Sequence, residues 1–352
     1  MARALQLARR GLYTTNPNPR VGCVLVRDGA IIGEGWHQRT GLGHAEVEAL
    51  KNLPDAKGAT AYVTLEPCSH YGRTPPCCDA LIHAGISRVV VAMQDPNPLV
   101  AGQGLQRLRS AGVEVVCGVL QEDAQHLNRG FIKRMTAQRP FVRSKLAMSL
   151  DGRTAMASGE SKWITSAQAR ADVQHLRAES SAILTGINTV LADDPALTAR
   201  VDEDVVQPVR VVLDSRLATP INAQLGKLPG RTLILTCLGD DLKKQALEHA
   251  GFEVYRVAEQ QGRLDLQEVM SFLAGQQINE VLVEAGAALN GALLAANLVD
   301  EWIVYMAPCI LGDQGRGLFN LPEMNTMADK KTLNLKDVRQ VGPDIKLTFT
   351  AN

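Results

Sequence analysis

The sequence predicts an α/β protein of two domains, each built on a sheet covered by helices. Three observations support this prediction. Strand-like and helix-like segments alternate along the whole chain, which is typical of layered α/β folds. The chain has 352 residues, whereas one domain has roughly 100–200. The alternation is interrupted at Pro140, because a proline favours an extended residue before it. We therefore expect one domain at residues 1–139 and a second at 140–352.

The first half begins with an amphipathic helix over residues 1–10, whose apolar side chains recur at helical spacing. An apolar, β-branched strand follows at 21–26, and Asp28-Gly29 is typical of the turn to a partner strand at 31–36. The same criteria predict strands at 61–65, 88–92 and 113–117, and helices at 44–51, 77–84, 104–111 and 121–135. This order predicts a largely parallel sheet between helices.

The second half opens with a strand at 141–147, which ends before an Asp151-Gly152 turn. A helix at 166–179 follows Thr165 and Ser166, residue types that favour a helix N-cap. Apolar runs predict further strands at 183–185, 209–213, 233–236, 253–256 and 281–284, with helical stretches between them. Two late strands at 302–306 and 345–350 are expected to be antiparallel. Polar composition predicts loops at 201–207 and 218–230.

Charge and composition exclude several classes of partner. Lys and Arg together equal Asp and Glu at 37 each, so no broad field attracts nucleic acid or an anionic membrane. No apolar run approaches the roughly 20 residues that span a bilayer, and the N-terminal segment does not have the pattern of a secretory leader. The seven cysteines are an odd number. We therefore expect reduced thiols and a cytoplasmic protein, with some thiols free to bind metal.

Residues of metal-binding type occur in one ordered pattern: His44-Ala45-Glu46, then Pro67-Cys68, then Cys77. A hydrolytic zinc site needs three protein ligands and one open position for water. His44, Cys68 and Cys77 meet this need, and helix starts next to the cysteines would favour their thiolates. Glu46 can reach the metal-bound water without being a ligand, so it is the candidate for proton transfer. The order is that of zinc nucleobase deaminases.

The spacing of the two cysteines departs from the C-x-x-C of those deaminases, because eight residues separate Cys68 from Cys77. The insert carries His70 and Arg73, which could contact substrate. Cys78 competes with Cys77 as a ligand, and we favour Cys77 because it directly follows a pair of prolines. Other histidines, including His37, have no partner pattern and are interpreted as structural or solvated.

Beyond this pattern, nearly the whole chain resembles the bifunctional riboflavin-biosynthesis deaminase/reductase family, and the long cysteine insert is highly specific to it. The resemblance lies in these segments: Asn16-Pro17-Asn18-Pro19, His44-Ala45-Glu46, Cys68-Ser69-His70, Gly72-Arg73-Thr74-Pro75-Pro76-Cys77, Asp95-Pro96-Asn97-Pro98, Ser149-Leu150-Asp151-Gly152-Arg153, Trp163-Ile164, Asp193-Asp194-Pro195 and Val283-Glu284-Ala285-Gly286. It implies a cytidine-deaminase-like three-layer domain at 1–139 and a dihydrofolate-reductase-like α/β domain at 140–352. The first would remove an amino group from a diaminopyrimidinone ribosylamine 5′-phosphate with Zn²⁺, and the second would reduce the ribosyl group to ribityl with NADPH.

The resemblance also implies site residues. In the deaminase, the substrate contacts would be Asn18, His70 and Arg73. In the reductase, the substrate wall would be Lys145, Ser161, Arg177, Asp193, Leu197, Arg200 and Glu284. A forked guanidinium suits a phosphate, so the two arginines of this wall are the candidates for it. The cofactor contacts would be Ala147, Trp163, Thr189, Asp193, Gly286, Ala287, Ala288, Leu289, Asn290 and Gly291.

Two other functions compete with this interpretation. A deaminase that edits tRNA, with an appended binding domain, would need a basic face and stacking aromatics, yet aromatic residues are 4%. A structural zinc module would need a fourth ligand, and only three well-placed ligands are visible in the sequence. It would also have no use for a neighbouring acid such as Glu46. The partner is therefore expected to be a small phosphorylated pyrimidine rather than nucleic acid or a membrane. A homodimer and a homotetramer both remain open, as does the physical basis for NADPH over NADH.

Overall fold

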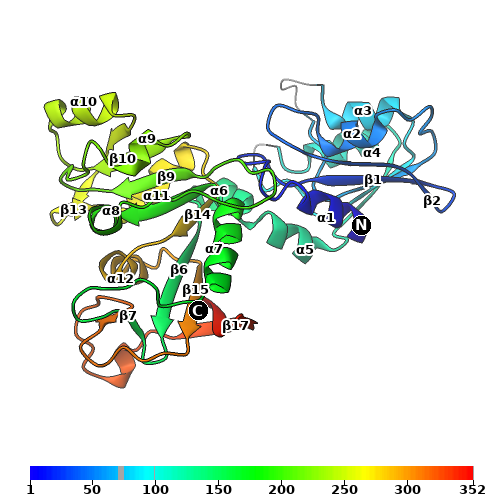
Figure 1. Cartoon of the computed structure of the whole chain (residues 1–352). Helices are drawn as coiled ribbons and strands as arrows, with labels where there is room; N and C mark the ends of the chain where they lie inside the picture. The colour runs from blue at the N-terminus through cyan, green and yellow to red at the C-terminus, as the bar shows by residue number, and fades with distance from the viewer. Residues whose placement is uncertain (70–74, 99, 352) are drawn as a thin grey trace. The chain divides into compact units, whose positions relative to one another are not determined.

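The computed structural model describes residues 1–69, 75–98 and 100–351. The chain forms two compact units, Met1–Arg139 and Pro140–Asn352, which are called unit 1 and unit 2 below. Figure 1 traces the chain through both units. None of the helices in the described part is long and apolar enough to cross a membrane.

Unit 1 contains a five-stranded sheet in the order β2-β1-β3-β4-β5. Its strands are β1 (Gly22–Arg27), β2 (Ala30–Trp36), β3 (Thr60–Val63), β4 (Arg88–Val91) and β5 (Glu114–Cys117). β3, β4 and β5 are parallel, whereas β1 pairs antiparallel with both β2 and β3. The hairpin expected at Asp28-Gly29 is present, and the antiparallel pairings of the sheet are those made by β1. The other three strands form the expected parallel part.

Helices cover both faces of this sheet, which confirms the three layers. The helices are α1 (Ala2–Arg9), α2 (Ala45–Leu50), α3 (Cys77–His83), α4 (Gln103–Ser110), α5 (Gln121–Leu127) and α6 (Arg129–Ala137). α2, α3 and α4 pack against one face, where Ala49, Leu81 and Leu108 meet Leu25 and Val89. α1 and α5 contribute to clusters with strand residues whose side chains point to the other face.

The single helix expected at 121–135 is two helices, which meet at Asn128. The Asn128 side chain accepts a hydrogen bond from Arg20 N at 2.8 Å and donates one to Arg20 O at 2.9 Å. Asn128 is 2% exposed. Its side chain thus provides hydrogen-bond partners for the backbone N–H and C=O of Arg20, which does not belong to a strand. Helical periodicity continues across this position, which is why the sequence pattern did not reveal the break.

Unit 2 contains a nine-stranded sheet in the order β11-β10-β9-β8-β14-β6-β15-β18-β17. The strands are β6 (Phe141–Ser149), β8 (Ala182–Gly186), β9 (Val209–Leu213), β10 (Thr232–Thr236), β11 (Glu253–Arg256), β14 (Glu280–Val283), β15 (Glu301–Ala307), β17 (Leu333–Val341) and β18 (Asp344–Ala351). The pairings are parallel from β11 to β15. β18 pairs antiparallel with β15 and with β17. The antiparallel late strands are confirmed, and β17 is an additional edge strand.

Helices cover both faces of this sheet as well. They are α7 (Ala167–Glu179), α8 (Ile187–Asp193), α9 (Gln224–Lys227), α10 (Asp241–His249), α11 (Leu266–Gly275) and α12 (Ala287–Ala295). α7 packs against Leu282 and Ile303, whereas α11 and α12 pack with Val281, Val283 and Val304. Because successive strand residues face opposite ways, these helices lie on opposite faces. The loop expected at 218–230 contains the short helix α9.

Candidate active sites

The three predicted metal ligands of unit 1 lie together. His44 is the residue before α2, Cys77 is the first residue of α3, and Cys68 follows β3. The distance from His44 Nδ1 is 3.2 Å to Cys77 Sγ and 3.6 Å to Cys68 Sγ. All three ligand atoms lie within 4.8 Å of one another. Tetrahedral zinc has bonds of about 2.3 Å to sulfur and 2.0–2.1 Å to nitrogen, so these separations fit one ion.

The two thiols interact directly, in a way that favours a bound cation. A hydrogen bond with Cys77 lowers the pKa of the Cys68 thiol, and the same interaction raises the pKa of Cys77. The backbone N–H of Cys77 donates to Cys68 Sγ at 3.2 Å, so the start of α3 also supports negative charge on Cys68. Two thiols that share a proton are a set that a divalent cation can bind after displacing that proton.

Cys78 points away from this cluster. Its Sγ donates to Pro67 O at 3.1 Å and contacts Gly104 O at 3.5 Å. Burial raises the pKa of the Cys78 thiol to about 12, so it stays protonated. Of the two adjacent cysteines, Cys77 is the one whose sulfur lies beside His44.

Glu46 lies beside the cluster without belonging to it. Its side chain is 3% exposed, and burial raises the pKa of its carboxyl to about 7. The carboxyl is close enough to hydrogen-bond the Cys77 thiol. A carboxyl group that can hold or release a proton near neutral pH suits acid–base catalysis.

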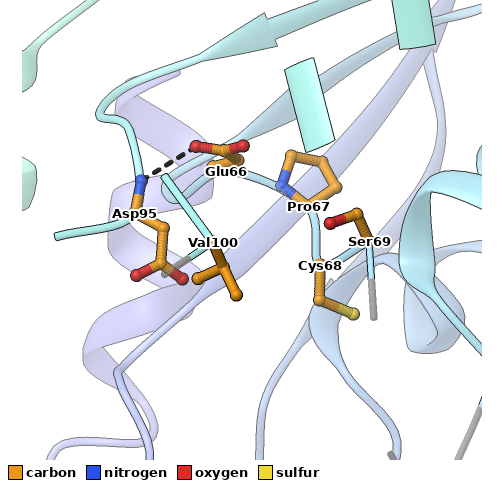
Figure 2. A pocket seen from close by; sticks show the side chains of 6 residues that line it. All are labelled: Glu66, Pro67, Cys68, Ser69, Asp95 and Val100. Atoms are coloured by element: carbon orange, nitrogen blue, oxygen red, sulfur yellow. Dashed lines mark hydrogen bonds between the residues drawn. The ribbon is translucent and has the colours of Figure 1, made fainter. Parts of the chain in front are cut away.

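A second glutamate, which the sequence analysis did not single out, fixes the segment that carries Cys68. One Glu66 oxygen accepts from the backbone of Gly104 at 2.8 Å, and the other accepts from Gly102 at 2.9 Å and Asp95 at 3.1 Å. Figure 2 shows this side chain beside a small pocket of about 10 Å³ that Cys68 also lines. The sequence did contain a signal for this role, because Glu66 stands directly before Pro67-Cys68, just after an apolar strand.

His37 also has a role that its sequence context did not reveal. Its Nδ1 lies 3.1 Å from Gly43 O, and its Nε2 lies 3.1 Å from Asn18 Nδ2. A carbonyl oxygen only accepts, so Nδ1 carries the hydrogen and Nε2 accepts from the Asn18 amide. Burial lowers the pKa of His37, which favours this neutral form. The contact orients Asn18, a predicted substrate contact, and leaves its carbonyl oxygen available.

The other two predicted substrate contacts of unit 1, His70 and Arg73, lie outside the described residues. Ser69, the last described residue before them, accepts a hydrogen bond from Arg107 at 3.1 Å. Arg107 also pairs with Asp79 of α3 at 2.7 Å. The start of the cysteine insert is thus connected to α3 and α4.

The predicted substrate residues of unit 2 meet around a buried ion pair. Arg177 of α7 donates from Nε and Nη2 to the two Glu284 oxygens at 2.6 and 2.9 Å, and the side chains are 12% and 14% exposed. Lys145 of β6 faces both: burial lowers its pKa, and Glu284 opposes that shift. Burial alone would raise the pKa of Glu284, but Arg177 and Lys145 hold it below its ordinary value.

The Leu197–Arg200 part of the wall is connected to this pair through the backbone, because Arg177 Nη1 donates to Thr198 O at 3.1 Å. Arg200 is exposed, and its backbone N–H donates to Gln174 of α7 at 3.1 Å. Leu197 is 3% exposed and packs in the core. Neither its side chain nor its backbone is therefore open to solvent.

The loop with Ser161 and Trp163 approaches the end of α8. Lys162, between them, forms an ion pair with Asp193 at 2.8 Å. Trp163 is 70% exposed, and the Arg170 guanidinium lies over its ring at 4.4 Å. Thr189 lies on α8 as well, so two of the predicted residues, Thr189 and Asp193, belong to this helix.

The turn after β14 enters α12 at Gly286, which is the N-cap residue. Asn290 is fully buried; its side chain accepts from Ser144 at 2.6 Å and donates to Ala285 O at 2.8 Å. At Gly291 a Cβ atom would lie 2.0 Å from Asn320 O. Asn290 and Gly291 therefore shape the turn. Of the cofactor contacts predicted between Gly286 and Gly291, the exposed ones are Gly286 and Ala288.

Comparisons with known proteins match both units. The RibD C-terminal domain model matches residues 140–347, and that of the cytidine and deoxycytidylate deaminase zinc-binding region matches residues 1–93. Riboflavin biosynthesis protein RibD of Escherichia coli (strain K12) is 54% identical over 361 residues, covering 99% of this chain and 97% of the relative. The protein of the same name from Haemophilus influenzae is 50% identical, covering 99% and 96%.

Solved structures give the same result over the full length. Acinetobacter baumannii RibD has a TM-score of 0.93 and 47% identity, covering 100% of this chain and 97% of the other. A diaminohydroxyphosphoribosylaminopyrimidine deaminase/5-amino-6-(5-phosphoribosylamino)uracil reductase from Thermotoga maritima has a TM-score of 0.88 and 34% identity, with the same coverage.

Proposed function

The chain belongs to the RibD family of riboflavin-biosynthesis proteins, and from that premise we propose which residues carry out its chemistry. It is a bifunctional enzyme with a deaminase domain and a reductase domain. We assign deamination of the diaminopyrimidinone ribosylamine 5′-phosphate to unit 1. Reduction of the ribosyl group of the product to ribityl is assigned to unit 2.

In unit 1, His44, Cys68 and Cys77 would hold one Zn²⁺, which lowers the pKa of a water towards neutrality. The fit of the three ligand atoms to one tetrahedral ion supports this assignment. Glu46 then acts as the proton carrier: its carboxylate accepts a proton from the attacking water and returns it to the 2-amino group. The C–N bond breaks, ammonia leaves, and the ring carbon becomes a carbonyl.

Recognition of the pyrimidine rests on Asn18, His70 and Arg73. The contact with His37 leaves the Asn18 carbonyl oxygen free to accept from a ring N–H or amino group. Arg73 is the candidate for the 5′-phosphate, because a guanidinium offers forked donors to phosphate oxygens.

In unit 2, the residues proposed to surround the ribosylamino phosphate are Lys145, Ser161, Arg177, Asp193, Arg200 and Glu284, with Leu197 beside them. When bound, NADPH would supply a hydride to the ribosyl carbon; the bond from that carbon to the ring oxygen breaks, and the ring oxygen takes up one proton. Lys145 is the proposed donor, since burial lowers its pKa. NADPH is proposed to contact Ala147, Trp163, Thr189, Asp193 and the turn from Gly286 to Gly291, where an N-terminal helix end favours phosphate.

The observation that carries this proposal is the cluster of three ligands with a buried acid beside it. Among the described residues no fourth ligand joins the cluster, whereas a structural zinc site would use one. A tRNA-editing function is disfavoured because both units match the riboflavin family over 99% of the chain. We propose a cytoplasmic location, where thiolate ligands stay reduced.

The test is incubation with the diaminopyrimidinone phosphate, with and without NADPH, followed by product mass. Ammonia release without NADPH and ribityl product only with NADPH are expected. A protein that releases no ammonia while it contains zinc would contradict the assignment of unit 1.

A further inference from the structure

A surface segment of unit 2 carries two of the proposed ligand contacts, Ser161 and Trp163. It joins β7 (Arg153–Ala155) to α7 and is called the 156–165 loop below. The structure describes the whole loop, and none of its residues is buried. A segment without a buried apolar side chain depends on polar contacts to hold its position. Such contacts therefore decide where the two proposed ligand contacts lie.

One polar contact holds the loop on α8. Lys162 Nζ lies 2.8 Å from an oxygen of Asp193, the last residue of α8, and the two side chains are 53% and 36% exposed. Asp193 is itself a proposed contact of both the substrate and the cofactor. Both ligands carry phosphate, so an unpaired carboxylate at this place would repel them. Lys162 therefore holds the loop and also neutralises this carboxylate.

A second contact holds the loop on α7. The Arg170 guanidinium lies over the Trp163 ring, 4.4 Å from its centroid, which is an attractive cation–π arrangement. Arg170 Nη1 also donates to Thr165 O at 2.6 Å, so one side chain contacts both the indole and the end of the loop. Trp163 remains 70% exposed, which leaves most of its surface available to a flat ligand ring.

Both anchoring helices lie on the sheet face that carries the reductase residues. α7 packs on Leu282 of β14, and α8 belongs to a cluster that contains Ile183 of β8. Leu282 and Ile183 are directly paired in the sheet, so their side chains point to the same face. Glu284, two residues after Leu282, points to that face as well and meets Arg177 of α7. The two contacts therefore attach the loop to helices that contribute residues to the site.

We propose that Lys162 and Arg170 are positioning residues of the reductase. They hold Ser161 and Trp163 in place before a ligand arrives, so that binding does not have to order the 156–165 loop. Neither residue takes part in hydride or proton transfer, so their contribution falls on ligand binding rather than on the chemical step. The inference rests on the proposed reductase function of unit 2 and names residues that act on that site through the loop.

The test measures ligand binding and loop motion in the full-length protein. Lys162→Met and Arg170→Gln should each raise the Kd for NADPH, titrated calorimetrically, by roughly two- to ten-fold, the cost of ordering a side chain on binding. The KM for NADPH should rise with the Kd, while kcat stays unchanged. Lys162→Arg keeps the ion pair and should restore wild-type binding. Equal melting temperatures verify folding.

Trp163 itself reports the motion of the loop without any ligand. In a Trp36→Phe background the remaining indoles are Trp163 and Trp302, and Trp302 is 1% exposed. The fluorescence anisotropy of the exposed indole should decay faster on the nanosecond timescale when either contact is removed. Arg231→Met is the matched control and should change neither the Kd nor the anisotropy. Its ion pair with Glu253 is similarly exposed, at 43% and 35%, and lies outside the loop.

The outcomes separate this inference from the proposed function. If the wild-type protein reduces the substrate with NADPH but both variants keep wild-type binding and anisotropy, the loop contacts do not position the site, and the reductase assignment stands. A fall in kcat at unchanged KM, weak binding by Lys162→Arg, or an equal loss in the control variant also contradicts the inference. If the wild-type protein binds no NADPH, both proposals are wrong.

Discussion

Replacing Arg177 with methionine tests the buried ion pair of unit 2. The side-chain stem of methionine still fills space against α7's neighbours, so Arg177→Met mainly removes the charge. Glu284, 14% exposed, then loses both guanidinium hydrogen bonds. Lys145 remains nearby and compensates in part.

Breaking a buried pair by removing one partner costs about 3–5 kcal/mol, and partial compensation favours the lower end, ~3 kcal/mol. For a unit of this length each 1 kcal/mol lowers the melting temperature by roughly 2–4 °C, so a decrease of roughly 6–12 °C is expected. The pKa of Glu284 is held low, so the pair stabilises the fold above the unfolded-state pKa of the carboxyl. That contribution is lost as pH falls through the lowered folded-state pKa, and the difference between variant and wild type should shrink in acid.

The assay is differential scanning calorimetry of the full chain at neutral and at acid pH, which measures the melting temperature of unit 2. The matched control is Arg231→Met, which breaks the Arg231–Glu253 pair on the same sheet. Those side chains are 43% and 35% exposed, so a cost of about 0–1 kcal/mol is expected. A decrease for Arg177→Met no larger than that of the control would refute the reasoning.

Three further outcomes are expected. Elemental analysis should find about one zinc per chain. Cys68→Ala should lose this zinc, while Cys78→Ala should retain it because that thiol points away; retention in Cys68→Ala would reject the ligand set. Glu46→Gln should slow ammonia release by about 10²–10⁴-fold and keep both zinc and NADPH oxidation with the deaminated substrate; loss of both activities in a folded protein would show that the two sites are not independent. Arg200→Ala should raise the reductase KM for the phosphorylated substrate by roughly 10–150-fold, since a charge-assisted contact contributes about 1.5–3 kcal/mol; an equal rise with a dephosphorylated analogue would exclude a phosphate contact.

Local patterns predicted most of the secondary structure because hydrophobic periodicity reports burial directly. β9 begins and ends at the residues that the apolar run predicted, and most other bounds differ by one or two residues. The failures have tertiary causes. Asn128 breaks a helix by pairing with Arg20, which is far away in sequence. β17 is a mostly exposed edge strand, so it carries no apolar run.

The sequence by itself determined the α/β class, the zinc-binding deaminase domain and the family, because ligand types and motifs are local. Only the tertiary structure decided which of Cys77 and Cys78 lies beside His44, since that depends on the direction of each side chain at the start of α3. It also paired Arg177 with Glu284, 107 residues apart, and brought Lys162 beside Asp193. These contacts depend on which strands and helices become neighbours, and that follows from packing the whole core.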